Sequence, residues 1–241
     1  AFQVIGILVL VAFYGCYFVK MFRQKQKGIQ TNQMSKGKSG KAKRIETTLA
    51  IATIVAPAVE VISIATGASA LPHLGRIGGA VAAVCGVTVF FLSVLTMRDS
   101  WRAGVSEQER TELVTGGIYQ ISRNPAFLGF DLVYIGILLM FFNPVLLAAS
   151  VFAIGMLHLQ IVKVEEPFLA SAFGAPYREY QRQVNRYLGR RNRLNCVLQT
   201  VRKGLEHESR YDADQQKENA CNRIGSLPAL RCCEGHRISC G

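Results

Sequence analysis

Acidic residues are scarce in this sequence of 241 residues: 16 Asp and Glu stand against 28 Lys and Arg, although half of the chain is hydrophobic. A soluble domain rarely combines these features, so apolar and charged stretches must be segregated along the chain. The sequence also lacks an internal repeat, and its basic stretches lack interleaved aromatic residues that could stack on bases. These absences argue against a transporter of paired halves and against nucleic acid as a partner.

Cysteine pairs with the spacing of a metal site are also absent. The chain has seven cysteines and no C-x2-C pair, and the irregular group Cys232, Cys233, His236 and Cys240 does not predict a metal site. Five of the seven fall within residues 191–241, a polar segment that we expect to be a weakly ordered cytoplasmic tail with reduced thiols. The C-terminus is not a prenylation box.

Apolar blocks of the length that spans a bilayer dominate the rest of the chain. They run over Phe2–Val19, Thr47–Thr66, Ile77–Met97, Ala126–Phe142 and Val145–Val162. Each is close to the roughly 17–25 residues that a transmembrane helix needs. The sequence therefore predicts an all-α, polytopic membrane protein with about five transmembrane helices. The first block is expected to be an uncleaved helix, because its basic cluster follows the apolar stretch instead of preceding it.

The basic residues predict which loops are cytoplasmic. Lys20–Arg44 carries nine Lys and Arg and no acid, so the loop of residues 20–46 is expected to be flexible and to lie inside. The 67–75 turn then lies outside, the Arg98–Arg123 loop inside, and everything after Lys163 inside. This places every basic segment on one side, with the N-terminus out and the C-terminus in. The basic loops either bind anionic lipid headgroups or only set this topology.

Three ionisable residues fall within or near the predicted spans. Such residues are costly in lipid unless they face a partner or a cavity. Glu60 is predicted near the middle of the second helix, Asp131 about a turn and a half into the fourth, and His158 in the last third of the fifth. Each is either a structural polar contact or part of a functional site.

A polar, glycine-rich segment precedes the fourth apolar block. Residues 115–125 read TGGIYQISRNP, in which Pro125 suits the first position of a helix and Asn124 its N-cap. The unpaired N–H groups of that helix start, beside Arg123, favour a carboxylate or phosphate ligand. A plain connecting loop with a capped helix is the alternative interpretation.

An acidic and aromatic segment follows the fifth block. Glu165 and Glu166 are adjacent where the helix leaves the bilayer, and two carboxylates there suit an ammonium or ribose hydroxyls. His158 lies seven residues before Glu165, so on a regular α-helix the two share one face. The two segments together predict an anion site and a cation site on the cytoplasmic side. S-adenosyl-L-methionine matches that pair of sites, and other amino-acid-like ligands match it in part.

Both segments resemble boxes of the isoprenylcysteine carboxyl methyltransferase family, which are integral membrane enzymes that use S-adenosyl-L-methionine. The first box is similar to Gly117-x-Tyr119-x3-Arg123-Asn124-Pro125-x-Phe127-Leu128-Gly129, and the second to the run from Glu165-Glu166 through Phe173-Gly174, Tyr177 and Tyr180 to Val184. The likeness covers about residues 101–188. Bacterial and archaeal-type members of the wider group resemble the chain best.

The resemblance implies a cytoplasmic pocket for S-adenosyl-L-methionine. The implied cofactor-binding residues are Tyr119, Arg123, Asn124, Pro125, Phe127, Leu128, Gly129, His158, Glu165 and Glu166. The implied catalytic residues among them are Arg123, His158, Glu165 and Glu166. Asn124 and Phe127 stand where the family often has His and Tyr, and Gln160 and Lys163 stand where eukaryotic members place an arginine before the acidic pair.

The implied reaction is methyl transfer to a lipophilic small molecule from the bilayer, either the carboxylate of a prenylcysteine-like molecule or a lipid amine. A non-catalytic lipid-binding or transport protein is the alternative, and sterol reductases, a third possibility, carry about twice as many spans. We expect three parts: N-terminal helices in residues 1–97, a methyltransferase core in 98–190 with the last two helices, and the tail.

Overall fold

The structure, a computed structural model, describes residues 1–27, 40–101, 112–190 and Gln215. Residues 191–241 except Gln215, residues 28–39 and residues 102–111 lie outside the described residues, and with them the five cysteines of the predicted tail and parts of the two basic loops. The prediction of a flexible loop over residues 20–46 is wrong at both of its ends, because residues 20–26 and 40–46 are helical. The elements in chain order are α1 (Phe2–Gln26), α2 (Gly40–Thr66), α3 (His73–Met97), η1 (Arg98–Ser100), η2 (Gly117–Gln120), α4 (Pro125–Met140), α5 (Pro144–Gln160), η3 (Ile161–Glu165), α6 (Glu166–Phe173) and α7 (Ala175–Gln183).

Four helices are long and apolar enough to cross a membrane. They are α1, α2, the continuous helix of α3 and η1, and the continuous helix of α5, η3 and α6. The apolar helix α4 is shorter, with 16 residues, which rise about 24 Å against a hydrocarbon core of about 30 Å. The predicted all-α, polytopic fold is confirmed, and each predicted span coincides with an apolar helix.

Four helices extend well beyond their predicted ends, among them α1, which runs to Gln26 instead of Val19, and α3, which begins at His73 instead of Ile77. Helix α2 begins at Gly40, seven residues before the predicted Thr47, because Lys, Arg and Ala favour helix even where the chain is polar. The fifth helix continues past the predicted Val162 to Phe173. Its continuation passes through η3, a π-helical turn in which the Glu166 N–H donates to the Ile161 carbonyl. The acidic pair therefore lies inside a helix and not beyond its end.

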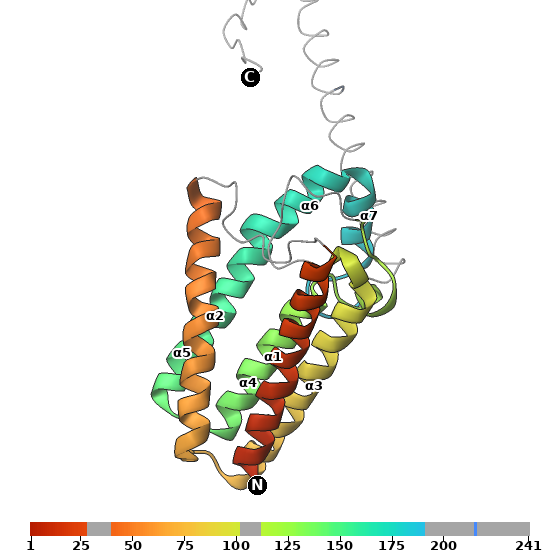
Figure 1. Ribbon diagram of the computed structural model, residues 1–241. Helices are drawn as coiled ribbons and strands as arrows, with labels where there is room; N and C mark the ends of the chain where they lie inside the picture. Colours follow the sequence, from red (N-terminus) through yellow and green to blue (C-terminus); the bar gives the residue numbers. More distant parts are fainter. Residues whose placement is uncertain (28–39, 102–111, 191–214, 216–241) are drawn as a thin grey trace, which may run out of the picture. The chain divides into compact units, whose positions relative to one another are not determined.

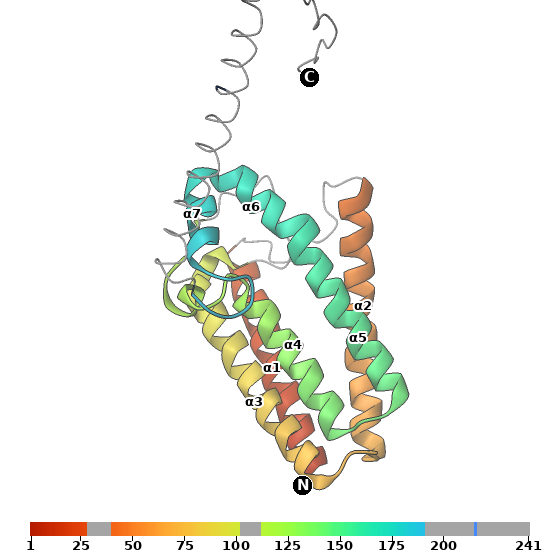
Figure 2. The ribbon, with the colours of Figure 1, turned by 180° about the vertical axis from the view of Figure 1, so that it is seen from behind.

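The apolar helices form two groups. Figures 1 and 2 show α2 beside α5, and α1 together with α3 and α4. Phe13 of α1 packs at 4.5 Å on Phe90 of α3 and at 4.7 Å on Phe130 of α4, measured between ring centroids. Helix α3, which the sequence assigns to the N-terminal part, thus packs directly on α4 of the predicted core.

Glycines set the close approach of α3 and α4. A Cβ built on Gly136 would meet the Ala83 amide nitrogen at 2.5 Å and the Gly79 carbonyl oxygen at 2.6 Å. One at Gly86 would meet the Gly129 carbonyl oxygen at 2.8 Å. Small residues allow such backbone contact between membrane helices. Since α3 and α4 both lead into the predicted site, this contact fixes the distance between their ends.

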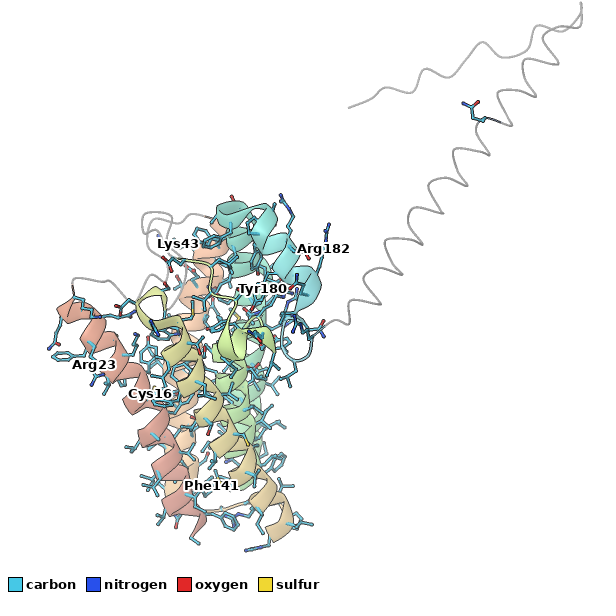
Figure 3. All side chains as sticks on the ribbon, turned by 90° about the vertical axis from the view of Figure 1, so that its right-hand side faces the viewer. Cys16, Arg23, Lys43, Phe141, Tyr180 and Arg182 are labelled. Atoms are coloured by element: carbon cyan, nitrogen blue, oxygen red, sulfur yellow. The ribbon has the colours of Figure 1, made fainter. Side chains whose placement is uncertain are left out.

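Labelled basic side chains lie at one end of the bundle, and the turn between α4 and α5 lies at the other. Figure 3 places Arg23 of α1, Lys43 of α2 and Arg182 of α7 at one end and Phe141 at the other. At the Phe141 end, Asn143 begins α5 as its N-cap and accepts a hydrogen bond from the Leu146 N–H at 2.9 Å. The predicted turn at Asn143-Pro144 is therefore confirmed, and the short turn leaves α4 and α5 as a hairpin.

Candidate functional site

Tyr119 is held from two directions. It lies in η2, and its hydroxyl hydrogen-bonds to the Ser93 hydroxyl of α3 at 2.7 Å. Its carbonyl accepts a hydrogen bond of 2.6 Å from the Tyr180 hydroxyl of α7. Burial, as the main cause, raises the pKa of Tyr119 above its ordinary value. The residue therefore ties the first motif segment to both α3 and α7.

Asn124 and Pro125 start α4 as the sequence predicts. Pro125 is the first helical residue and Asn124 occupies the N-cap position. The Asn124 side chain makes no capping hydrogen bond, however; its Nδ2 donates to the Arg186 carbonyl at 3.1 Å. The expected cap is thus correct in position, while the side chain is used for a tertiary contact.

The loop of residues 184–190, which follows α7, packs against residues 115–125, the first motif segment. The Arg123 N–H donates to the Asn185 carbonyl at 3.1 Å, and the Gly189 N–H donates to the Ile121 carbonyl at 2.9 Å. The buried Ser122 hydroxyl adds a hydrogen bond of 3.4 Å to the Arg186 carbonyl. The loop is thereby placed against the start of α4 by its own backbone.

Two arginines converge on Glu166. Arg186 donates from Nε and Nη2 to the two carboxylate oxygens at 2.9 and 2.7 Å, and Arg123 lies 3.0 Å from the same carboxylate. The hydrogen bonds to Glu166, as the largest effect, raise the pKa of Arg186. Two guanidiniums and one carboxylate leave a net charge of +1. Glu166 therefore orients two cations, and the cluster suits an anionic group.

His158 is paired with a residue that the sequence did not single out. Its Nδ1 lies 2.6 Å from the Tyr187 hydroxyl, and the two rings stack with centroids 6.0 Å apart. The expectation that His158 and Glu165 share a face assumed a regular α-helix, whereas the π-helical η3 lies between them. Tyr187 belongs to the loop of residues 184–190, so this loop contacts Arg123, Glu166 and His158.

The other predicted residues lie around this cluster. Pro125 is buried, and Leu128 is half-buried. Phe127 packs against the apolar cluster of α2 and α5, and Gly129 lies against Phe90 of α3. Glu165 is half-buried and close enough to Tyr119 for its charge to add to the raised tyrosine pKa. Gln160 is turned to α2, where its Nε2 donates to Glu46 at 3.2 Å.

One donor of this cluster is left without a partner. The Arg123 side chain is 9% exposed, and its Nε is buried without a hydrogen-bond partner. A buried donor left unpaired is unfavourable, so an acceptor atom from a ligand would complete the site. The Tyr177 hydroxyl, 3.4 Å from Arg123 Nη1, bounds the same guanidinium.

The fold and the site together describe a helical membrane protein with a polar cluster of net positive charge at one end of its bundle. Residues 74–176 match the family model described as phospholipid methyltransferase. The matched segment is thus similar to this family, and it makes up less than half of the chain. Arg186 and Tyr187 lie just beyond the matched residues, and the continuing motif up to Val184 was the signal that could have pointed to them.

Curated proteins named protein-S-isoprenylcysteine O-methyltransferase are similar to parts of the chain. The chain is 32% identical over 80 residues to protein-S-isoprenylcysteine O-methyltransferase B of Arabidopsis thaliana, covering 33% of this chain and 41% of the relative. It is 38% identical over 72 residues to protein-S-isoprenylcysteine O-methyltransferase of Saccharomyces cerevisiae, covering 30% of each. The enzyme of that name in Dictyostelium discoideum is 29% identical over 108 residues, covering 44% and 46%. The chain thus spans less than half the length of these three relatives.

Proposed function

We propose that this protein transfers a methyl group from S-adenosyl-L-methionine to a lipophilic acceptor that arrives from the bilayer. The observation that carries the proposal is the network of Arg123, Glu166 and Arg186, which joins the two motif segments through contacts of 2.7 to 3.0 Å. The names of the relatives support a methyltransferase over a non-catalytic lipid-binding or transport protein.

The residues present fit S-adenosyl-L-methionine. Arg123, with its unpaired Nε, would hold the carboxylate, and Glu165 would face the ammonium or the ribose hydroxyls. The bound cofactor supplies an activated methyl group on its sulfonium. The chain's part is then to orient the two reactants and to exclude water from the site. Glu166, held by two arginines, keeps Arg123 in position.

The acceptor is the carboxylate of a prenylcysteine-like molecule or a lipid amine. A carboxylate is already ionised at neutral pH and needs no base. An amine must lose a proton, and His158 would accept it at Nε2 in the tautomer whose Nδ1–H donates to the Tyr187 hydroxyl. The relatives' names favour the carboxylate.

We place the site on the cytoplasmic side of the membrane, with the N-terminus outside. Arg23, Lys43 and Arg182 lie at the same end of the bundle as α6 and α7 (Figure 3), and basic residues favour the cytoplasmic side. These side chains and Lys163 would also attract anionic lipid headgroups, each contributing about 1 kcal/mol near an anionic leaflet.

Calorimetric binding of S-adenosylhomocysteine to detergent-purified protein tests the cofactor assignment. Arg123→Ala and Glu165→Ala are expected to weaken binding by at least about tenfold, because each removes a charge-assisted contact. Arg178→Ala, which removes an exposed guanidinium of α7, is the matched control and is expected to bind like the wild type. A folded wild-type protein that binds no S-adenosylhomocysteine would refute the proposal.

Methyl transfer to candidate acceptors separates the two substrate classes. The wild type is incubated with labelled S-adenosyl-L-methionine and either S-farnesylcysteine or phosphatidylethanolamine. Transfer to S-farnesylcysteine that persists in a His158→Gln variant indicates a carboxylate acceptor, which needs no base. Transfer to phosphatidylethanolamine that is lost in this variant indicates an amine acceptor.

A further inference from the structure

Two large apolar side chains are exposed away from the apolar helices. Ile121, in the first motif segment, is 55% exposed, and Leu188, in the loop of residues 184–190, is 62% exposed. Every other exposed large hydrophobic side chain among the described residues lies on α1, α2, α3, α4 or α5, where lipid would cover it. The Gly189 N–H, next to Leu188, donates to the Ile121 carbonyl at 2.9 Å. The two side chains therefore belong to one place on the surface, unlike the single exposed apolar residues that are common on proteins.

The loop presents Leu188 from a closed turn. The Asn185 N–H donates to the Gly189 carbonyl at 2.9 Å, and the Asn185 side chain donates from Nδ2 to the Leu188 carbonyl at 3.2 Å. Gly189 has a φ of 103°, a conformation that favours glycine, and this lets the chain turn back directly after Leu188. The exposure of Leu188 is thus a property of a hydrogen-bonded turn and not of a loose chain end.

This turn lies where the apolar helices begin. On one side, the Asn185 carbonyl accepts a hydrogen bond of 3.1 Å from the Arg123 N–H, two residues before α4 starts at Pro125. On the other side, Tyr187 stacks on His158, which belongs to a helix long and apolar enough to cross a membrane. Figure 2 shows the chain after α7 returning beside the start of α4. The lipid-facing surface of the bundle therefore continues onto the turn.

The composition of the turn fits a lipid surface better than a second copy of the chain. Residues 184–190 read VNRYLGR, with no acidic residue. Tyrosine and arginine beside an apolar side chain are typical of the level at which a protein leaves the bilayer. Arg182 and Arg190 are exposed nearby in sequence, and anionic lipid headgroups attract such side chains. A second copy of a chain with a net charge of +12 would instead bring like charges together.

We propose that Ile121 and Leu188 form an anchor that inserts into the boundary between headgroups and acyl chains on the side of the candidate site. The anchor holds the cluster of Arg123, Glu166 and Arg186 at the membrane surface, because the same loop carries Arg186 and hydrogen-bonds to Arg123. A lipophilic acceptor then reaches the cluster while its apolar tail stays in the bilayer. This last consequence rests on the proposed methyl transfer, whereas the insertion itself does not.

The test is quenching of tryptophan fluorescence in proteoliposomes by phosphatidylcholine brominated near the top of its acyl chains. Leu188→Trp and Ile121→Trp are each made in a Trp101→Phe background, which removes the one native tryptophan. Both are expected to lose emission to the same extent as Leu159→Trp, a reference on the exposed surface of α5. Glu179→Trp, at an exposed position of α7, is the matched control and is expected to keep its emission and to emit at longer wavelength.

Two outcomes overturn the proposal. The first is emission at residues 121 and 188 that is quenched by acrylamide in the water and not by the brominated lipid. The second is emission shielded from both quenchers, because protein and not lipid would then cover the two side chains. If Trp101→Phe fails to fold, the same substitutions in the wild-type chain decide, with the emission of Trp101 subtracted. The measurement needs no cofactor, so failure of the anchor and failure of the proposed methyl transfer are told apart.

Discussion

Replacing Gly136 by alanine is expected to force α3 and α4 apart. The added Cβ would lie 2.5 Å from the Ala83 amide nitrogen, 2.6 Å from the Ala83 Cβ and 2.6 Å from the Gly79 carbonyl oxygen. Ordinary contacts between heavy atoms are about 3.5–4.0 Å, so the helices must separate by about 1 Å. No side-chain rotation relieves the clash, because backbone atoms and a Cβ make all three contacts.

Such overpacking costs about 1–3 kcal/mol, and the affected helices both end at the candidate site. Helix α3 carries Ser93, which hydrogen-bonds to Tyr119, and α4 begins at Pro125, directly after the N-cap residue Asn124. A displacement of about 1 Å between catalytic groups can lower a rate by about a hundredfold. Gly136→Ala is therefore expected to lower both the unfolding temperature in detergent and the rate of methyl transfer.

Gly155→Ala is the matched control for that substitution. Gly155 lies on α5, and a Cβ there would meet no atom within 4 Å. This variant is expected to be as stable as the wild type or more stable, because alanine is favoured over glycine in helices by about 1 kcal/mol. Thermal unfolding that is the same for both variants would show that the close approach of α3 and α4 is not what stabilises the bundle.

Two further substitutions test other contacts. Arg186→Lys keeps the positive charge, but a lysine cannot donate to both Glu166 oxygens in the way that Arg186 does. Its affinity for S-adenosylhomocysteine, measured by calorimetry, is expected to fall about tenfold. Unchanged affinity would mean that Arg186 does not position the site. Asn143→Ala removes the N-cap of α5 and is expected to lower stability by about 0.5–2 kcal/mol in thermal unfolding. Asn143→Ser retains a capping oxygen and is expected to lose less stability. An equal loss of stability in the two variants would contradict the capping role.

The helices and their turns could be predicted because their signals are local. Apolar length alone located every span, and Pro125 and Pro144 each follow an Asn that occupies the N-cap position. The motif segments could be recognised for the same reason, since each is continuous in sequence. Arg123 and Glu166 were both expected at the site, and the structure brings them within 3.0 Å of each other.

The remaining features depend on contacts between distant segments. Gly129 stands in a motif, but its packing against α3 also depends on Gly86, about forty residues away, and no local pattern gives that register. The extra contacts of Asn124 with Arg186, and of His158 with Tyr187, arise from a loop that has no secondary structure signal of its own. Their partners could be found only once the chain was folded.

The π-helical turn at Ile161–Glu165 acts as a phase shift within one long helix. Each residue of an α-helix advances the direction of the side chain by about 100°. A π-helical turn holds one residue more than an α-helical turn. A chain that lost one residue in this turn could therefore run on as a uniform α-helix with the Glu166 carboxylate still directed at both arginines, whereas the same loss within α5 would turn that carboxylate by about 100°. The turn is therefore the place in this long helix where loss of one residue leaves the direction of the acidic pair unchanged, while the α-helical part before it tolerates substitutions but not deletions.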